Sequence, residues 1–282
     1  MWRASVPLIG LPAQSAARSK ASGDGDTLPF SGLSLPAPEA ADEARAGAIH
    51  RCSARPLSKD GAAPIDGTVC ATIWPTRSLK SSQRWFDEFF LWTEGFHAST
   101  TQRARIQLAA LRTALQMLER EDSEQIGITL SFGTVERFLD LLIEALDSHA
   151  FVTHRIAVVV RGAVDRLRSR YRIRSFCEYL RSRHAAIGYL LTAPTISAEA
   201  KALDLVQPDF AKLPAPGSTR IDSWQDFLLE AHVAGIPDEK MIVGGLHTPE
   251  QLGVARQLGV PFGQGNAVRP AFAPPAFWTI GP

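Results

Sequence analysis

The sequence predicts an α/β protein, a TIM-like (β/α) barrel that is imperfect at its N-terminal end. From Val69 onward, short β-branched or apolar runs alternate with amphipathic helical stretches, a pattern typical of βα units around a parallel sheet. Eight such runs occur, which is enough to close a barrel. The chain has 282 residues, 45% of them hydrophobic, so it can bury the core of one barrel of about 200–250 residues.

The predicted strands are short runs rich in Val, Ile, Leu and aromatic residues, and they span residues 69–74, 88–92, 126–131, 156–160, 186–191, 205–210, 241–245 and 260–265. The predicted helices span residues 102–119, 133–148, 172–184, 196–203, 222–234 and 248–258. No helical stretch lies between the first two strands, so the first βα unit is incomplete. In the helix that contains Trp224, apolar residues recur at i, i+3, i+4 and i+7, which indicates packing against a core.

Two segments at the ends of the chain depart from the barrel pattern. Residues 1–65 are rich in Ala, Ser, Gly and Pro, a composition that cannot offset the entropy of ordering, so we predict a disordered tail there. The barrel domain is predicted over residues 66–282, and it ends in an extension of prolines and aromatic residues. Phe272, Phe277 and Trp278 in this extension are expected either to close one end of the barrel or to anchor a protein partner.

Charge and cysteine content argue against several classes of function. Thirty Lys and Arg residues stand against 29 Asp and Glu residues, and the formal charge of +1 gives no field that would recruit nucleic acid or an anionic membrane. The three cysteines have neither the spacing of a disulfide framework nor that of a zinc site. The longest apolar runs fall short of the roughly 18 residues that cross a bilayer. We therefore expect a cytoplasmic protein with no membrane span and no nucleic-acid partner.

A glycine-bounded segment near the end of the chain carries a family pattern. Gly244-Gly245-Leu246-His247-Thr248 resembles the EGVET segment of the EAL domain, the barrel phosphodiesterase of bacterial cyclic di-GMP signalling. Gly263-Gln264-Gly265 falls at the spacing of that family's QG turn, and Pro208-Asp209-Phe210-Ala211-Lys212 resembles its PDxIK segment. The resemblance implies a barrel of EAL type over residues 65–270.

Three earlier segments extend this resemblance. Ile126–Ser131 resembles the family strand that ends in NLS, and Arg155–Ala163 resembles the strand that reads LELTES. Trp74-Pro75 is similar to the family's QP, which places Glu88 on the Glu of the EAL motif itself, with Asp87 as the alternative for that position.

The chemistry of the family needs divalent metal ions, which oxygen ligands hold at successive strand ends. The resemblance places those ligand positions on Glu88, Thr129, Val159, Leu191, Thr192 and Gly244. One carboxylate cannot assemble a two-metal site, so the pattern predicts a degenerate EAL domain that is no enzyme and has no cofactor. Mg²⁺ or Mn²⁺ is expected only if the chain is a hydrolase after all. Lys212 and Gln264 also match family positions, and with Glu88 they are expected to be remnants of the site.

Alternation along the strands predicts what fills the lumen of the barrel. If Glu88 points inward, so does Trp92, which falls where the family has the Arg that contacts the ligand phosphate. Arg161, at a predicted strand end, would form an anion site at the mouth of the barrel if it met Lys212 and Gln264. The simpler interpretation is that Arg161 is a solvated residue at a strand end.

These observations lead to one main functional hypothesis and two alternatives. The main hypothesis is a regulatory or scaffold module that acts through contacts with a protein partner. Such a module is expected to bind cyclic di-GMP weakly or not at all, and a homodimer is compatible with it. The first alternative is a non-catalytic receptor for cyclic di-GMP or another nucleotide, held by Arg161, Lys212 and Gln264. The second alternative is a residual cyclic di-GMP phosphodiesterase.

Overall fold

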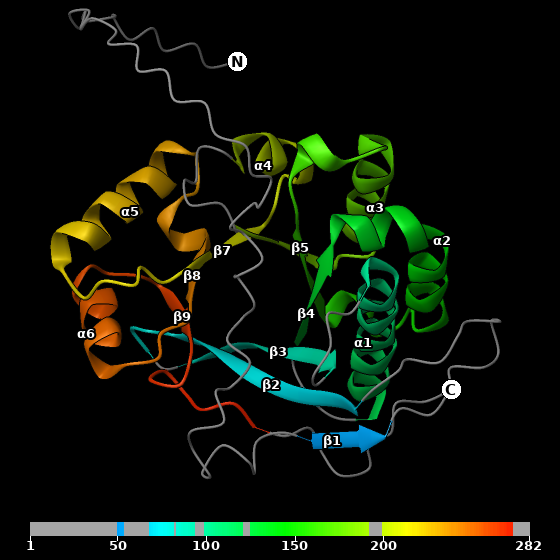
Figure 1. Ribbon diagram of the computed structural model, residues 1–282, viewed down its shortest axis with the longest axis horizontal. Helices are drawn as coiled ribbons and strands as arrows, with labels where there is room; N and C mark the ends of the chain where they lie inside the picture. The colour runs from blue at the N-terminus through cyan, green and yellow to red at the C-terminus, as the bar shows by residue number, and fades with distance from the viewer. Residues whose placement is uncertain are drawn as a thin grey trace, which may run out of the picture. The chain divides into compact units, whose positions relative to one another are not determined.

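The computed structural model describes residues 50–53, 68–81, 83–93, 99–120, 125–191 and 199–272, and Figure 1 shows how these parts are arranged. Within these ranges, one sheet of nine strands is surrounded by helices. No helix in the described ranges is long and apolar enough to cross a membrane.

The strands of the sheet follow one another in chain order. They are β1 (His50–Ser53), β2 (Thr68–Ser78), β3 (Arg84–Thr93), β4 (Ile126–Ser131), β5 (Ile156–Arg161), β6 (Ala186–Leu190), β7 (Phe210–Pro214), β8 (Met241–Gly244) and β9 (Phe262–Gln264). Because β2 also pairs with β9, the strands from β2 to β9 close into a barrel. β2 runs antiparallel to β3 and β9, whereas the pairs from β3 to β9 are parallel. The predicted barrel is therefore confirmed, including the missing helix between its first two strands.

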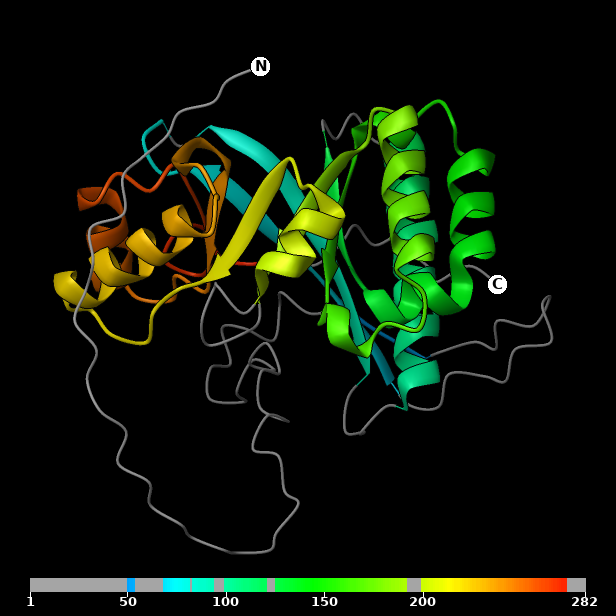
Figure 2. The ribbon, with the colours of Figure 1, turned by 90° about the horizontal axis from the view of Figure 1, so that it is seen from above.

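In the described ranges, six α-helices connect the parallel strands. They are α1 (Thr100–Arg120), α2 (Phe132–Ser148), α3 (Arg170–Ser182), α4 (Ala200–Val206), α5 (Ile221–Val233) and α6 (Pro249–Gln257). Two views show α1, α2 and α3 together on one flank of the barrel and α5 and α6 on another (Figures 1 and 2). The first turn of α6 shows how the sequence determines where a helix begins. Thr248 caps the helix, Gln251 returns a hydrogen bond to the cap, and Pro249 occupies the first turn.

The prediction for residues 205–210 was wrong. Residues Ala200–Val206 form α4, and β7 begins only at Phe210. Ala202, Leu205 and Val206 are buried at helical spacing, so one turn of amphipathic helix competes successfully with the strand signal. Gln207 then takes a left-handed conformation with φ +48°, which ends the helix before Pro208.

A second correction concerns the predicted tail. His50–Ser53 lies inside the segment expected to be disordered, yet it forms β1 and pairs antiparallel with the first residues of β2. The physical reason is the edge of β2, which would otherwise leave backbone groups unpaired there. The rest of residues 1–65, apart from these four, lies outside the described residues.

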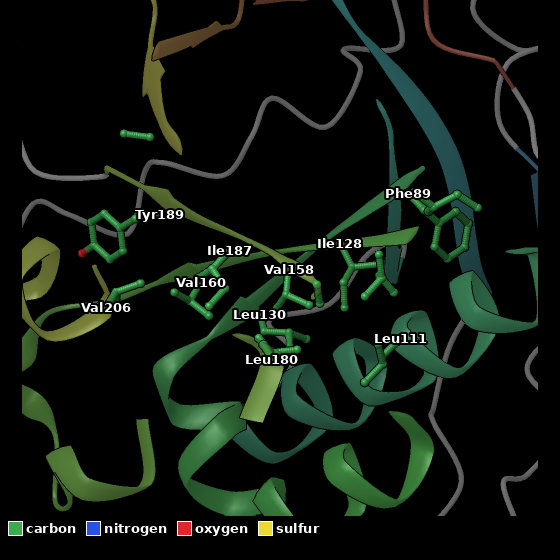
Figure 3. Close-up of a cluster of buried hydrophobic side chains, with 14 of the residues drawn as sticks. Phe89, Leu111, Ile128, Leu130, Val158, Val160, Leu180, Ile187, Tyr189 and Val206 are labelled. Atoms are coloured by element: carbon green, nitrogen blue, oxygen red, sulfur yellow. The ribbon is translucent and has the colours of Figure 1, made fainter. Parts of the chain in front are cut away.

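Alternation along the strands separates two cores. The outward side chains of β4 and β5, including Ile128, Leu130 and Val158, pack against Leu111 of α1 and other helical residues (Figure 3). The inward side chains form a second cluster inside the barrel, made of Phe86, Ala157, Val159, Phe210 and Ile242. The rings of Phe86 and Phe210 lie 5.4 Å apart although β3 and β7 are not neighbours in the sheet, so they meet across the lumen.

Glycines make room for the rings in the lumen. A Cβ on Gly188 would lie 2.4 Å from the ring of Phe210, and a Cβ on Gly127 would lie 2.6 Å from the ring of Phe86. These two strand positions therefore accommodate the bulk of aromatic side chains from other strands.

After β9 the chain returns to the barrel. Phe272 forms an isolated bridge with Ile73, with backbone hydrogen bonds of 2.9 and 3.0 Å in the two directions. This bridge falls between the part of β2 that pairs with β1 and the part that pairs with β9. Phe272 remains 37% exposed, while Phe277 and Trp278 lie outside the described residues.

Truncating the chain after Pro270 should lower the melting temperature by roughly 2–8 °C. The truncation removes the two backbone hydrogen bonds of Phe272 with Ile73, and a loss of about 1–2 kcal/mol corresponds to this shift for a domain of this size. Differential scanning calorimetry of the full and truncated chains measures the effect. An unchanged melting temperature would contradict a closing role for this segment.

Candidate active site at the carboxyl end of the strands

A buried polar cluster lies inside the barrel toward the carboxyl ends of its strands. Glu88 of β3, Thr129 of β4, Lys212 of β7 and Gln264 of β9 form this lumen cluster. Glu88 is fully buried, and Lys212 and Gln264 are 4% and 5% exposed. The charged groups of the cluster are therefore shielded from bulk water. Charge–charge interactions are stronger in such an interior than at a surface.

Glu88 is the centre of this lumen cluster. Its Oε1 accepts a hydrogen bond of 2.6 Å from Thr129 Oγ1, and its Oε2 accepts from Lys212 Nζ at 2.5 Å and from Gln264 Nε2 at 3.1 Å. Lys212 Nζ also donates to Gln264 Oε1 at 2.5 Å and lies 5.4 Å from the centre of the Phe90 ring. Both carboxylate oxygens are thus engaged, and one negative charge is matched by one positive charge.

Gln264 ties this cluster to β2. Its Nε2 donates to the carbonyl oxygen of Trp74 at 3.2 Å and lies 3.3 Å from Thr76 Oγ1. Since β2 and β9 are the strands that close the barrel, the amide of Gln264 joins the closing seam to the ion pair.

The alternation of β3 decides between the two acidic residues of the EAL-like motif. Glu88 faces the lumen, whereas Asp87 pairs on the other side of the strand with Arg84 at 2.7 Å and with Arg77 at 3.8 Å. Glu88 therefore occupies the position inside the barrel, and Asp87 contributes to the arginine-rich outer face of β2 and β3.

Arg161 ends β5 on the same side of the strand as Val159, which packs inside the barrel. No hydrogen bond or ion pair joins its side chain to another residue of the described ranges. Burial lowers the pKa of the Arg161 guanidinium, the nearby Arg103 lowers it further, and Glu88 acts in the opposite direction. Two guanidinium groups thus lie close enough to repel each other at this end of the barrel.

The sequence-predicted anion site is only partly assembled. Lys212 and Gln264 are bonded to Glu88 and to each other, and no bond links them to Arg161. Arg103, by contrast, was missed, because a residue in the first turn of α1 has no sequence signal that places it beside a strand end.

The remaining family positions are occupied as follows. Val159 and Leu191 are buried apolar residues, and Thr192 lies outside the described ranges. A Cβ on Gly244 would approach Lys212 Cε to 2.9 Å, so the lysine stem fills the space beside this glycine. Within the described part of the chain, no group of three or more His, Cys, Asp or Glu side chains is arranged around a metal position. The oxygen atoms that a cation would meet here belong to Glu88, Gln264 and Thr129, and the cation would compete with the Lys212 ammonium for them.

No family model and no curated protein matches this sequence. Solved structures do. The EAL enzyme Bd1971 in its cAMP- and cyclic-di-GMP-bound form has a TM-score of 0.52 and 18% identity, over 73% of this chain and 62% of that one. The phosphodiesterase PaMucR in complex with c-di-GMP has a TM-score of 0.55 and 16% identity, over 74% and 98%. The chain has the fold of an EAL domain.

A third neighbour of this EAL-type barrel is the Bacillus subtilis YkuI protein with an EAL domain, in complex with c-di-GMP and calcium. Its TM-score is 0.53 at 16% identity, over 74% of this chain and 55% of that one. The chain thus spans less than two thirds of Bd1971 and of YkuI, but nearly all of the PaMucR structure.

Two predictions made from the missing carboxylates are contradicted by these neighbours. The first is that this chain is no enzyme, since the neighbours that share its fold include Bd1971, an EAL enzyme, and PaMucR, a phosphodiesterase. The second is that it has no metal cofactor, since the YkuI complex contains calcium. Both predictions counted metal ligands by matching single residues of this chain to the family's positions at the strand ends. At identities of 16–18%, such residue-by-residue matching is too weak to decide whether the site binds metal or catalyses a reaction.

Proposed function

We propose that this barrel is a regulatory module of cyclic di-GMP signalling, which binds the dinucleotide at the carboxyl-end mouth and passes the signal on through protein contacts. The observation that carries the proposal is Arg161, a guanidinium at the mouth with no bonded partner in the described ranges. The structures of Bd1971, PaMucR and YkuI named above support it, because each holds c-di-GMP on the same fold.

The chemistry of the ligand suits this position. Cyclic di-GMP presents two phosphodiester groups, and a guanidinium binds a phosphate through two parallel, charge-assisted hydrogen bonds. A phosphate placed beside Arg161 would also lie near a second positive charge, that of Arg103.

The lumen cluster has a different part in the proposal. Lys212 is neutralised by Glu88 and held by Gln264, so it presents no free charge to a phosphate. We assign these residues to the floor beneath the ligand, where they keep the closing strands β2, β3, β7 and β9 in place. Arg161 then supplies the direct contact, and the floor supplies its rigidity.

Arg161→Ala should weaken the binding of cyclic di-GMP by about tenfold or more, because a charge-assisted contact to phosphate is worth about 1.5–3 kcal/mol. Isothermal titration calorimetry, carried out with and without Mn²⁺ or Ca²⁺, measures the affinity. Chromatography of the same samples detects any linear dinucleotide that is formed. This second readout determines whether the bound dinucleotide is also hydrolysed.

The control for this experiment is Arg168→Ala, which removes an exposed arginine from the segment between β5 and α3. Its affinity should equal that of the unchanged protein. The proposal fails if no heat of binding is detected even with a large excess of cyclic di-GMP, or if both variants bind as tightly as the unchanged protein.

A second candidate is a scaffold that works through protein contacts without a nucleotide. The observation in its favour is the exposure of large apolar side chains on α5, where Leu229 and Val233 are 63% and 78% exposed. The absence of any heat of binding with cyclic di-GMP, together with a specific protein contact at α5, would favour this candidate.

A further inference from the structure

Positive charge is concentrated in one segment of this chain. Residues 161–183 contain eight of the 30 Lys and Arg residues, all of them Arg, but only two of the 29 Asp and Glu residues. This segment therefore has a formal charge of +6, and the rest of the chain has a formal charge of −5. The whole-chain charge of +1, which argued against a nucleic-acid partner, thus conceals a strongly basic segment.

Four exposed arginines of this segment have no bonded partner. Every second residue from 166 to 174 is an Arg. Arg172 pairs with Asp140 at 3.5 Å. The other four are exposed, and no ion pair or hydrogen bond engages their side chains within the part of the chain that the structure describes. We call these four residues and the neighbouring Tyr171 the arginine patch, which consists of Arg166, Arg168, Arg170, Tyr171 and Arg174.

The nearby carboxylates do not neutralise the arginine patch. Asp165 pairs with Lys201 at 3.7 Å, and Glu136 Oε1 accepts a hydrogen bond of 2.6 Å from the backbone N–H of Ser169. Helix α3 has no acidic residue in its first turn, although negative charge stabilises that end of a helix and positive charge does not. The arginines therefore do not stabilise the helix that carries them, which favours a role in binding.

Tyr171 adds an aromatic ring to the arginine patch. It is 77% exposed, and it is the only large apolar or aromatic side chain that is exposed in residues 161–183, all of which the structure describes. Arg174 follows it by three residues on α3, so the ring and this guanidinium are neighbours on the helix surface. An aromatic ring that is open to solvent beside cationic groups can stack on an unpaired base.

We propose that the arginine patch binds single-stranded nucleic acid. Its guanidinium groups hold phosphates through paired, charge-assisted hydrogen bonds, and Tyr171 stacks on an unpaired base. A duplex keeps its bases paired and leaves the ring unused. A protein interface or a lipid surface needs a larger exposed apolar area than one Tyr provides. This inference does not rest on the nucleotide site proposed above, since Arg161 is not part of the patch.

The binding should be weak and should depend strongly on salt. A dissociation constant on the order of 1–100 µM is expected, as for binding without sequence specificity. Four phosphate contacts on a single strand give a slope of about −2.8 for log affinity against log salt concentration, so the affinity should fall roughly fiftyfold between 50 and 200 mM NaCl. Fluorescence anisotropy of labelled RNA and DNA decamers with the full chain measures both quantities. Binding to both decamers would indicate contacts with phosphates and a base alone, and binding to one would identify the nucleic acid.

Two kinds of variant test the two parts of the arginine patch. Arg170→Glu/Arg174→Glu should weaken binding at least tenfold at 50 mM NaCl and should halve the salt slope, because two of the four phosphate contacts are lost. Tyr171→Ala should weaken binding about fivefold or more without changing the salt slope, because the ring carries no charge. Tyr171→Phe keeps the ring and should bind as the unchanged protein does.

The control variant Lys240→Glu/Arg256→Glu reverses two exposed basic residues outside the patch, one in η5 (Asp238–Lys240) and one in α6. Its change in net charge equals that of Arg170→Glu/Arg174→Glu, yet it should lose no more than about threefold in affinity, because it removes no phosphate contact. Circular dichroism should show that all variants are folded. The proposal is overturned if this control loses as much affinity as the patch variant, or if Tyr171→Ala binds as tightly as the unchanged protein.

Two competitors decide which class of partner the arginine patch fits. Polyglutamate and vesicles of phosphatidylserine and phosphatidylcholine, added at the same charge concentration as the decamer, should not displace it, because neither offers a base to Tyr171. Displacement by polyglutamate would assign the patch to an acidic protein, and displacement by vesicles would assign it to a membrane surface. Either result would overturn the proposal, as would the absence of binding at 200 µM protein and 50 mM NaCl.

Discussion

Replacing Lys212 with methionine should lower the free energy of unfolding by about 3–5 kcal/mol, because it leaves the carboxylate of Glu88 buried without its counter-charge. Methionine keeps most of the volume of the lysine stem, so the packing beside Gly244 changes little. The loss therefore reports the electrostatic part of the cluster. Denaturation with guanidinium chloride, followed by far-ultraviolet circular dichroism, measures it.

The double variant Glu88→Gln/Lys212→Met tests whether the loss of stability in Lys212→Met comes from the uncompensated charge of Glu88. Removing both charges also removes the uncompensated one, so the double variant should be more stable than Lys212→Met and should recover most of the loss. Lys201→Met is the matched control, since Lys201 is exposed and its pairing with Asp165 at 3.7 Å is a surface contact worth little. If Lys212→Met costs no more than Lys201→Met, the ion pair inside the barrel has no structural role.

The parallel part of the barrel could be predicted from the sequence because its strands are buried on both faces. β4 and β5 read as continuous apolar runs, IGITLS and IAVVVR, and their predicted bounds agree with the structure to within one residue. Helices such as α2 follow with a strong amphipathic period, and Ser131 caps that helix through the backbone N–H of Thr134. In these βα units, the burial pattern and the local hydrogen bonds thus predict the same strands and helices.

The elements that could not be predicted depend on contacts distant in sequence. β1 forms only because the edge of β2 offers it backbone partners, and HRCS itself has no strand period. The bridge between Ile73 and Phe272 joins residues that lie near the two ends of the barrel domain in the sequence. Such pairings are decided by which edge remains open once the barrel has closed, and a local pattern does not contain that information.

The candidate site shows the same division. The resemblance matched Glu88, Lys212 and Gln264 to site positions, and the structure brings all three together. Their interaction was not foreseen, since an ion pair between β3 and β7 requires the closed barrel to set the distance across its lumen. The expectation that these residues are mere remnants overlooked this, because it treated each matched position separately.

The turn after Gln264 connects the lumen cluster to the mouth. Leu246 N donates to the carbonyl oxygen of Gln264 at 3.0 Å, and Ala267 N donates to the carbonyl oxygen of Leu246 at 3.0 Å. The loop after β8 is thereby fastened to the loop after β9. Gly265 lies in this turn with φ +147°, a backbone conformation that side chains rarely allow.

Gly265→Ala should therefore be among the most damaging single-methyl substitutions, with an expected loss of about 3–5 kcal/mol from strained backbone and steric conflict together. A Cβ on Gly265 would lie 2.3 Å from the carbonyl oxygen of Leu246, and its other close neighbours are also backbone atoms of that residue. Backbone cannot move aside as a flexible side chain can, so the two loops must separate.

Gly253→Ala is the matched control, because it adds the same methyl group within α6, where no atom lies within 4 Å of the new Cβ. In a helix interior that change should raise stability by up to about 1 kcal/mol. Thermal unfolding of both variants measures the contrast. Equal melting temperatures would show that the turn at Gly265 is free to rearrange and that it does not hold the mouth of the barrel together.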